Sequence, residues 1–220
     1  MPKGIKIHSS KNLEGRKKKA AKIIKILKKL FPHAKIALNY SNCWELLVAV
    51  VLSAQCTDKK VNEVTQTLFK KYRTSDDYIN ANHKEFEQNI KPTGFYRQKT
   101  TNILSCAKII KEKFGGEVPR TMEELLTLPG VARKTANMVL GNAYGIVEGI
   151  AVDTHITRLA RVLGLTDETN PDKIERDLMQ IIPKKEWFDF TYRLIEYGRT
   201  YCPAKPHNHA TCPLSKINDP

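Results

Sequence analysis

A lysine near the middle of the chain is the first candidate for chemistry. Lys134 lies in the segment Leu128–Ala136, which has the composition of a tight turn that leads into a helix. A positive side chain in the first turn of a helix opposes the helix dipole, so the sequence accepts a local cost there. That cost is explained if the charge binds an anion, or if the lysine loses its proton easily and its neutral amine acts as a nucleophile. An ordinary solvated lysine explains the local sequence equally well.

An aspartate further along the chain is the second candidate. Asp153 follows the apolar run Ile150–Val152 and stands where a capping residue would begin a helix over residues 154–163. Most aspartates in such a position only cap the helix. A carboxylate at this place can also assist a reaction electrostatically. His155 would then be a supporting partner, although a histidine in the first turn of a helix is more often packed or solvated.

The turn before Lys134 has the composition of a phosphate-binding hairpin. Gly130 permits a positive φ and lets the backbone come close to a ligand. The next helix, expected over residues 131–143, presents its first N–H groups and the positive end of its dipole, and both suit a phosphate. We therefore expect Gly130, Ala132 and Arg133 to contact a nucleic-acid backbone without reading the base sequence.

Helices must position all of these residues, because strand patterns are nearly absent from the sequence. Apolar residues recur at helical spacing through most of the chain, and Pro32 and the pair Gly115-Gly116 mark helix ends. Helices are expected at about residues 15–30, 42–52, 58–69, 76–90 (in shorter pieces), 98–114, 121–126, 131–143, 154–163, 171–181 and 185–199. The sequence therefore predicts an all-α protein of about ten helices.

The charge is concentrated at the start of the chain. Residues 1–35 hold twelve Lys or Arg and one acid, a net charge of +11, whereas the remaining residues contribute only +3. A polyanionic partner fits this distribution, and so does a solvated basic helix face without a partner. If the segment binds DNA, deleting residues 1–14 should weaken binding, mostly at higher salt, and leave the chemistry intact.

Cellular location is inferred from the cysteines and from the lack of targeting patterns. The chain has five cysteines, an odd number, which does not suggest a disulfide framework and fits a reducing cytoplasm. No stretch approaches the roughly 20 apolar residues needed to cross a bilayer, and no secretory signal pattern follows the basic start. We expect a monomer in a bacterial or archaeal cytoplasm, associated with the nucleoid and not with a membrane.

Several motifs together resemble one known family. The hairpin Leu128–Ala136, followed by Val152–His155, resembles the endonuclease III family of DNA glycosylases in the helix–hairpin–helix superfamily. Leu52–Asp58, Gly94–Lys99 and Gly116–Pro119 resemble further motifs of that family. The resemblance extends over about residues 36–202, and the combination is far more specific than any one motif.

The resemblance implies a fold and an assignment of site residues. It implies two helical domains that flank a DNA-binding cleft, one of residues 36–147 and one joining residues 1–35 to 148–220. Lys134 and Asp153 match the catalytic lysine and aspartate. Gln55 matches the residue that fills the space left by a flipped base, and Phe95 matches a wedge position that is often leucine in the family. The expected DNA-binding residues are Gln55, Phe95, Gly130, Ala132, Arg133, Thr154 and His155.

The resemblance also implies a reaction. Members flip a damaged nucleotide out of the duplex, and the lysine attacks the sugar C1′ so that the base leaves and an imine forms. Elimination then breaks the strand on the 3′ side of the abasic site. The presence of Lys134 favours this bifunctional glycosylase/AP lyase of base excision repair, with oxidised pyrimidines and abasic sites in double-stranded DNA as substrates. A glycosylase for mismatched uracil or thymine, or a non-catalytic helix–hairpin–helix DNA-binding module, are the alternatives.

The C-terminal segment departs from the family. Most members hold a [4Fe–4S] cluster with four cysteines, whose first and third positions match Cys202 and Cys212, whereas the second and fourth fall on His209 and Asn218. Because a standard cluster needs four cysteines, we expect it to be absent and the protein to have no cofactor. A tetrahedral zinc bound by Cys202, His207, His209 and Cys212 is the alternative, although the single residue between the histidines makes joint ligation awkward.

Overall fold

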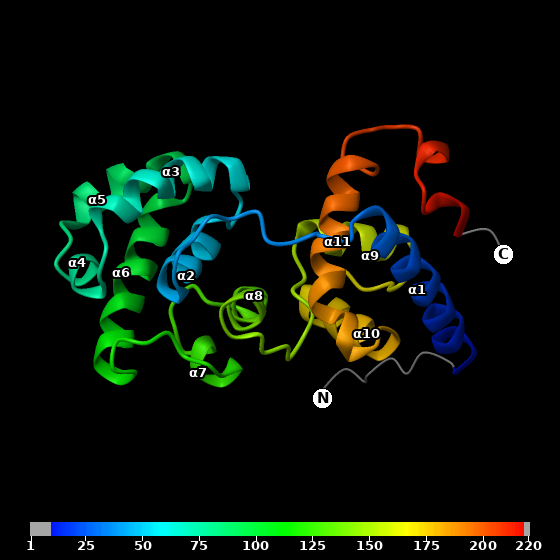
Figure 1. Ribbon diagram of the computed structural model, residues 1–220, viewed down its shortest axis with the longest axis horizontal. Coiled ribbons are helices and arrows are strands. Elements are labelled where there is room, and N and C mark those ends of the chain that lie inside the picture. Colours follow the sequence, from blue (N-terminus) through cyan, green and yellow to red (C-terminus); the bar gives the residue numbers. More distant parts are fainter. Residues whose placement is uncertain (1–9, 218–220) are drawn as a thin grey trace, which may run out of the picture. The chain divides into compact units, whose positions relative to one another are not determined.

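The computed structural model describes residues 10–217, and the regular elements among them are all helices (Figure 1). The α-helices are α1 (Ser10–Leu30), α2 (Cys43–Leu52), α3 (Asp58–Lys71), α4 (Ser75–Ile79), α5 (His83–Ile90), α6 (Tyr96–Lys113), α7 (Met122–Leu126), α8 (Arg133–Tyr144), α9 (Thr154–Val162), α10 (Pro171–Ile181) and α11 (Trp187–Thr200). Short 3₁₀ turns are η1 (Lys91–Thr93), η2 (Lys184–Glu186), η3 (His209–Thr211) and η4 (Ser215–Ile217). The all-α prediction is confirmed.

Side-chain caps explain many of the helix starts. Asn42, Thr57, Thr121 and Asp153 each accept a hydrogen bond from a backbone N–H in the first turn of the helix that follows. Such a bond satisfies one of the N–H groups that an α-helix leaves unpaired at its start. The first helix begins at Ser10, earlier than the sequence pattern indicated, so α1 continues through a glycine at position 15. The basic residues before Ser10, which belong to the segment proposed for deletion, lie outside the described residues.

The chain forms two compact units, and their boundary follows Glu148. The inner unit comprises Ile36–Glu148, and the two-segment unit joins the chain up to Lys35 with the chain from Gly149 on. The sequence placed the boundary one residue earlier. Each unit therefore carries one of the two candidate reactive side chains, Lys134 in the inner unit and Asp153 in the other.

The inner unit is built around α2. Every side chain from Leu46 to Leu52 is buried, so this short helix is apolar all round, as is typical of a central core helix. Helices α3, α6 and α8 pack against it. The helix that carries Lys134 is thus fixed directly to the core of its unit.

The two-segment unit has a core of its own. Helix α1 contributes Ile23 and Leu27, which are fully buried together with Leu159 of α9 and Phe190 of α11. Helix α11 packs against both α1 and α9. The N-terminal helix is therefore an integral part of the unit that carries Asp153.

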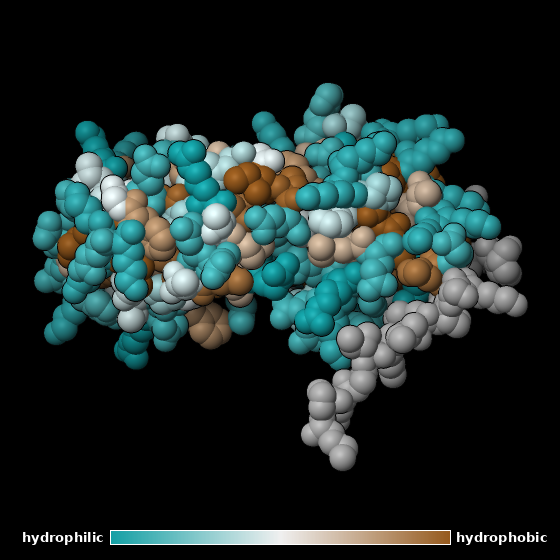
Figure 2. Space-filling view, turned by 90° about the horizontal axis from the view of Figure 1, so that it is seen from below, coloured by the Kyte–Doolittle hydropathy of each residue, from teal (hydrophilic) through white to brown (hydrophobic). Residues whose placement is uncertain are grey.

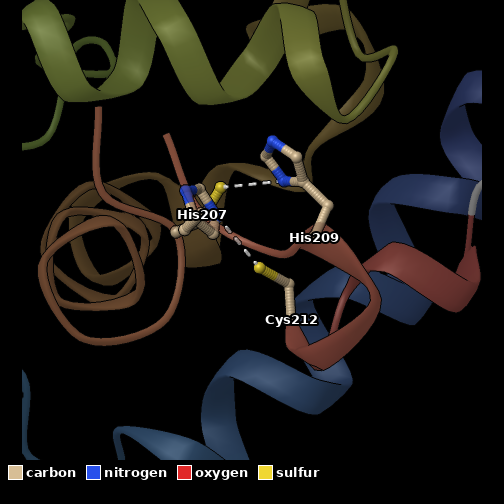
Figure 3. A group of neighbouring side chains, drawn as sticks. His207, His209 and Cys212 are labelled. Carbon is tan, nitrogen blue, oxygen red and sulfur yellow. Dashed lines mark hydrogen bonds between the residues drawn. The ribbon is translucent and has the colours of Figure 1, made fainter. Parts of the chain in front are cut away.

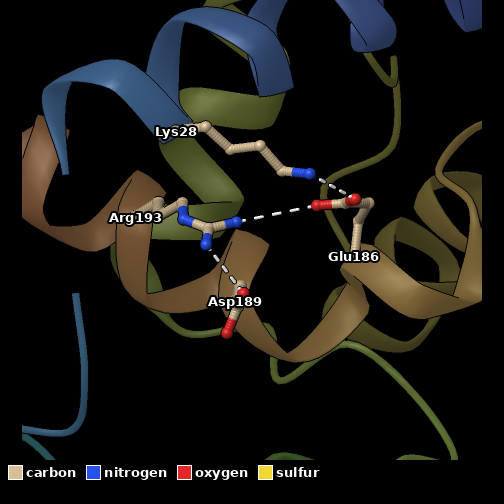
Figure 4. A network of polar contacts seen from close by, with 4 residues as sticks. All are labelled: Lys28, Glu186, Asp189 and Arg193. Carbon is tan, nitrogen blue, oxygen red and sulfur yellow. Dashed lines mark hydrogen bonds and ion pairs between the residues drawn. The ribbon is translucent and has the colours of Figure 1, made fainter. Parts of the chain in front are cut away.

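A network of four charged residues, two of them buried, supports the same unit (Figure 4). Arg193 of α11 donates to Asp189 at 2.7 Å and lies 3.6 Å from Glu186, while Lys28 of α1 pairs with Glu186 at 2.6 Å. Arg193 is 9% and Glu186 7% exposed, so both charges are largely removed from water. Because a buried charge is costly without its partner, this network fixes how α1 and α11 meet.

The composition of the helices bears on whether a part of the described chain could cross a membrane. Hydrophilic residues cover most of the face in Figure 2, with hydrophobic residues in small groups. Between residues 10 and 217, no helix has both the length and the apolar character needed to cross a membrane.

Candidate active site

The hairpin that precedes Lys134 contains a glycine that a larger residue could not replace without strain. Gly130, between α7 and α8, has φ +76°, a left-handed conformation that favours glycine. A Cβ at this position would lie 2.3 Å from Nδ2 of Asn102 in α6. Gly130 is therefore required both for its backbone conformation and for the close approach of the Asn102 side chain.

Helix α8 begins in an arrangement suited to an anion. Its N-cap is Ala132, exposed and extended, and within the described chain no side chain caps this helix. Arg133 and Lys134 occupy the first turn and are both half-buried. The positive end of the dipole and two cationic side chains thus share one short segment, as expected for a phosphate contact.

Asp153 caps helix α9, and the capping hydrogen bond fixes the orientation of its carboxylate. Its Oδ1 accepts a hydrogen bond of 2.8 Å from the backbone N–H of Ile156. Because a carboxylate has two oxygens, the cap orients the group without using all of its acceptor capacity. Thr154 beside it is exposed, while His155 is half-buried. A Cβ added to Gly198 of α11 would lie 3.1 Å from the His155 ring, so the histidine is packed against α11.

The predicted residues around Lys134 and those around Asp153 therefore form two separate groups. Arg133 and Lys134 follow Gly130 and Ala132 at the start of α8 in the inner unit, and Asp153, Thr154 and His155 lie at the start of α9 in the two-segment unit.

Gln55, between α2 and α3, and Phe95, directly before α6, lie in two loops of the inner unit and have the same unusual backbone. Their φ values are +53° and +47°, and both side chains are exposed, Phe95 by 64%. Left-handed backbone at residues other than glycine is uncommon and is held in place by the surrounding structure. Two loop residues with strained backbone that present a polar and an aromatic side chain to solvent suit insertion into a duplex.

A buried lysine joins these two loops. Lys99 of α6 is 5% exposed, and its Nζ donates hydrogen bonds of 2.8 Å to the carbonyls of Leu52 and Thr93. Burial lowers the pKa of this amine. One side chain thus fixes the start of the loop that carries Gln55 and the start of the loop that carries Phe95. The sequence analysis placed Lys99 at the end of a motif that resembles the family but gave no sign of this role.

One face of α9 adds to Thr154 several residues that the sequence analysis missed. An open depression of about 650 Å³ is lined by Thr154, Thr157, Arg158, Arg161, Val162 and Pro171. The two threonines and two arginines recur at the i, i+3, i+4, i+7 spacing of one helix face. That spacing was visible in the sequence, and it places two guanidinium groups on the helix that Asp153 caps.

The C-terminal segment brings together four side chains that could hold a metal ion. One donor atom each from Cys202, His207, His209 and Cys212 lies within 4.8 Å of the others. The single residue between the two histidines, which was expected to make joint ligation awkward, leaves both rings beside the two thiols. Asn208 is extended, and in extended backbone residues two apart point to the same side. The expectation of a metal-free segment is thus not confirmed.

The donor set does not fit the cluster common in relatives. Endonuclease III relatives usually carry a [4Fe–4S] cluster, which takes four cysteine thiolates. Here two of the four donors are imidazoles, and Asn218 at the fourth expected position lies outside the described residues.

The fold and these sites define a class of protein. Residues 48–184 match the HhH-GPD superfamily of base excision DNA repair proteins. The chain is 47% identical over 207 residues to endonuclease III of Synechocystis sp., covering 94% of each chain. A solved non-covalent endonuclease III–DNA complex superimposes with a TM-score of 0.87 at 45% identity, over 91% of this chain and 94% of that one. A trapped endonuclease III–DNA covalent intermediate gives 0.86 at 46% identity, over 90% and 93%.

The chain belongs to the endonuclease III family, as the sequence motifs predicted. It is a DNA glycosylase with AP lyase activity that acts in base excision repair.

Proposed function

We propose that this protein excises oxidised pyrimidines, such as thymine glycol, from double-stranded DNA and then cleaves the abasic site by β-elimination. The observation that carries the proposal is Lys134, half-buried in the first turn of α8, directly after the Gly130 hairpin. The trapped covalent endonuclease III–DNA intermediate of a relative 46% identical supports a covalent route. Lys134 is the amine that forms the bond.

The chemistry follows from a neutral amine and a fixed carboxylate. The lone pair of Lys134 Nζ attacks C1′ of the flipped nucleotide, the C1′–N bond breaks, and the base takes the electron pair and a proton. The amine loses its protons as the sugar ring opens, and an imine joins Nζ to C1′. Removal of a C2′ proton then expels the 3′ phosphate and breaks the strand. Asp153 stabilises positive charge on the sugar during attack.

DNA is held largely through its backbone. The start of α8 binds phosphate with the dipole and Arg133, and the α9 face with Arg158 and Arg161 supplies further positive charge. Gln55 and Phe95 enter the duplex, the first filling the vacated position and the second stacking near the unpaired base. The protein acts as a monomer in the cytoplasm, beside the nucleoid, where its DNA substrate lies.

Borohydride trapping on duplexes with thymine glycol or an abasic site tests the assignment. The unchanged protein should become covalently linked to both DNAs, and Lys134→Ala should not. Asp153→Asn keeps a capping residue at the start of α9, so it should fold and bind DNA while excision slows by about 10²–10³-fold.

The matched control is Lys173→Ala, which removes an exposed lysine of α10. It should trap DNA like the unchanged protein. Trapping that survives Lys134→Ala would move the nucleophile elsewhere, for instance to the N-terminal amine. Excision of uracil or thymine from mismatches in preference to thymine glycol would overturn the substrate class and leave the nucleophile in place.

A further inference from the structure

The geometry points to a single zinc ion bound by Cys202, His207, His209 and Cys212, in place of an iron–sulfur cluster. Two sulfurs and two imidazole nitrogens form a donor set typical of tetrahedral structural zinc. The four residues lie in the two-segment unit, after α11. The inference concerns a different site from the proposed reaction and does not depend on it.

The distances match one tetrahedral ion. Cys202 Sγ lies 3.9 Å from His209 Nδ1, and Cys212 Sγ lies 3.4 Å from His207 Nε2. Zinc bond lengths of about 2.3 Å to sulfur and 2.0–2.1 Å to nitrogen give a tetrahedron with edges of about 3.3–3.8 Å. All four donor atoms already lie within 4.8 Å of one another, so only small rotations close the site. Figure 3 shows His207, His209 and Cys212 turned toward one another.

Hydrogen bonds to His207 and Cys202 orient these side chains as metal ligands. Nδ1 of His207 lies 2.9 Å from the carbonyl of Lys205, which fixes the proton on Nδ1 and leaves the Nε2 lone pair directed at the group. The guanidinium of Arg158 lies 3.7 Å from Cys202 Sγ and also donates to the Cys202 carbonyl. Metal-bound histidines and thiolates commonly have supporting contacts of this kind.

Proton and charge balance are simple. Each cysteine releases its thiol proton to solvent when the ion binds, including the proton that Cys212 donates to the Tyr201 carbonyl at 3.0 Å. Two thiolates then neutralise a divalent ion. The centre needs no further counter-ion, and the imidazoles remain neutral.

Burial gives the site a closed side and an open side. Cys202 is 2% and Cys212 4% exposed, and both belong to the core of the two-segment unit. His207 is half-buried and His209 exposed, so an ion can enter from solvent. The ion would fasten the short turns η3 and η4 to the end of α11, a region with little regular structure to hold it.

Iron–sulfur centres fit this arrangement less well. In a four-iron cluster each thiolate binds a different iron, so the ligand atoms stand further apart than those around one ion. A two-iron centre of the Rieske type places both histidines on one iron and both cysteines on the other. Here each sulfur instead has an imidazole nitrogen as a close neighbour, and all four donors converge.

Metal analysis of the full chain, expressed with iron and zinc both supplied, tests the inference. We expect about one zinc per chain, no acid-labile sulfide and no visible absorbance. Replacing zinc by Co²⁺ should give the intense visible bands of a tetrahedral ion with thiolate ligands. Iron with sulfide would overturn the inference, and so would protein that takes up neither zinc nor Co²⁺.

Variants locate the ion without relying on enzyme activity. Single changes His207→Ala and His209→Ala should reduce metal content and lower the Tm. The matched controls are His83→Ala and Cys56→Ser in the inner unit, which should keep the zinc. If a ligand variant fails to fold, the Co²⁺ spectrum of the unchanged protein and a chelator-induced fall in its Tm still decide the question. Zinc retained in both histidine variants would overturn the assignment.

Discussion

At the scale of single residues, two reasons require a glycine at position 130: its left-handed backbone and the room it leaves for Asn102. The cost of violating each can be measured separately. Its φ of +76° disfavours any side chain, and a new Cβ would also meet Asn102. Gly145 has a similar φ of +67°, but among the described residues nothing lies within 4 Å of its added Cβ. An alanine at position 145 therefore introduces the backbone strain alone, whereas an alanine at position 130 introduces the same strain together with a steric clash.

Gly130→Ala should destabilise the protein more than Gly145→Ala does. Both variants incur about 1 kcal/mol or more from the left-handed backbone, and Gly130→Ala adds about 1–3 kcal/mol of overpacking. Urea unfolding measures the difference, and DNA affinity should fall only for Gly130→Ala. Adding Asn102→Ala to Gly130→Ala should recover part of the loss. Equal destabilisation by the two alanines would refute the role of the Asn102 contact.

Which residues could be predicted from sequence depends on how local their determinants are. Asp153 as a cap and Gly130 at a positive φ follow from neighbours within a few positions, and the structure has both. Lys99 could not be understood in this way, since its two acceptors, Leu52 and Thr93, meet only in the folded chain. The approach of His207 to Cys212 likewise depends on the path of the chain after α11.

At the scale of elements, the hairpin is tied to α6 by a buried thiol. Cys106 of α6 is 1% exposed, and its Sγ donates to the carbonyl of Pro129 at 3.3 Å. Burial raises the pKa of this thiol from 9.0 to about 12. The turn that precedes Lys134 is therefore held in part by a group that must stay protonated.

Stability should fall at alkaline pH through Cys106. Above about pH 9 the unfolded chain loses the thiol proton while the folded chain keeps it, so the free energy of unfolding decreases as pH rises toward 12. The slope from this one group is at most about 1.4 kcal/mol per pH unit. Cys106→Ala should lose this component, and its unfolding free energy should decline less steeply between about pH 8.5 and 10.5.

Denaturant titrations at several pH values measure the effect as a difference between variant and unchanged protein. The raised pKa values of Tyr78 and Tyr197 act in the same direction in both proteins and cancel in that difference. Ser105→Ala, a change in the same helix that removes no titratable group, is the control and should keep the full slope. If the free energy of unfolding changes with pH equally in Cys106→Ala and in the unchanged protein, the thiol has the same pKa in the folded and the unfolded chain, and the prediction is wrong.

Helix ends show a similar division between local and distant causes. The starts of α2 and α3, expected at about residues 42 and 58, were readable because the capping side chains of Asn42 and Thr57 are adjacent to their helices in sequence. The start of α1 was not, because a glycine at position 15 costs about 1 kcal/mol in a helix and suggests an end. Tertiary packing of Ala20, Ile23 and Leu27 overrides that local preference.

At the scale of the whole molecule, the positive charge is carried mainly by one helix and the residues before it. Residues 1–35 have a net charge of +11 and the rest of the chain only +3. The exposed residues Lys18, Lys22, Lys25 and Lys29 recur at the spacing of one helix face, while Ala20, Ile23 and Leu27 are buried. This lysine stripe is a surface that can contact the backbone of long DNA, and neutral substitutions there leave the core untouched.

Replacing the lysine stripe by glutamine should reduce the salt dependence of DNA binding. Each phosphate contact contributes about 0.9 to the slope of log K against log salt, so loss of four contacts lowers the slope by up to about 3–4. The matched control also replaces four exposed lysines by glutamine, but in the inner unit: Lys70, Lys84, Lys108 and Lys113. Binding to an abasic duplex at several salt concentrations gives both slopes, and single-turnover excision at saturating protein should stay unchanged in the stripe variant.

If both variants lose slope equally, net charge alone attracts the DNA. If the stripe variant keeps its full slope, α1 does not contact the DNA and its lysines serve only to keep that face solvated.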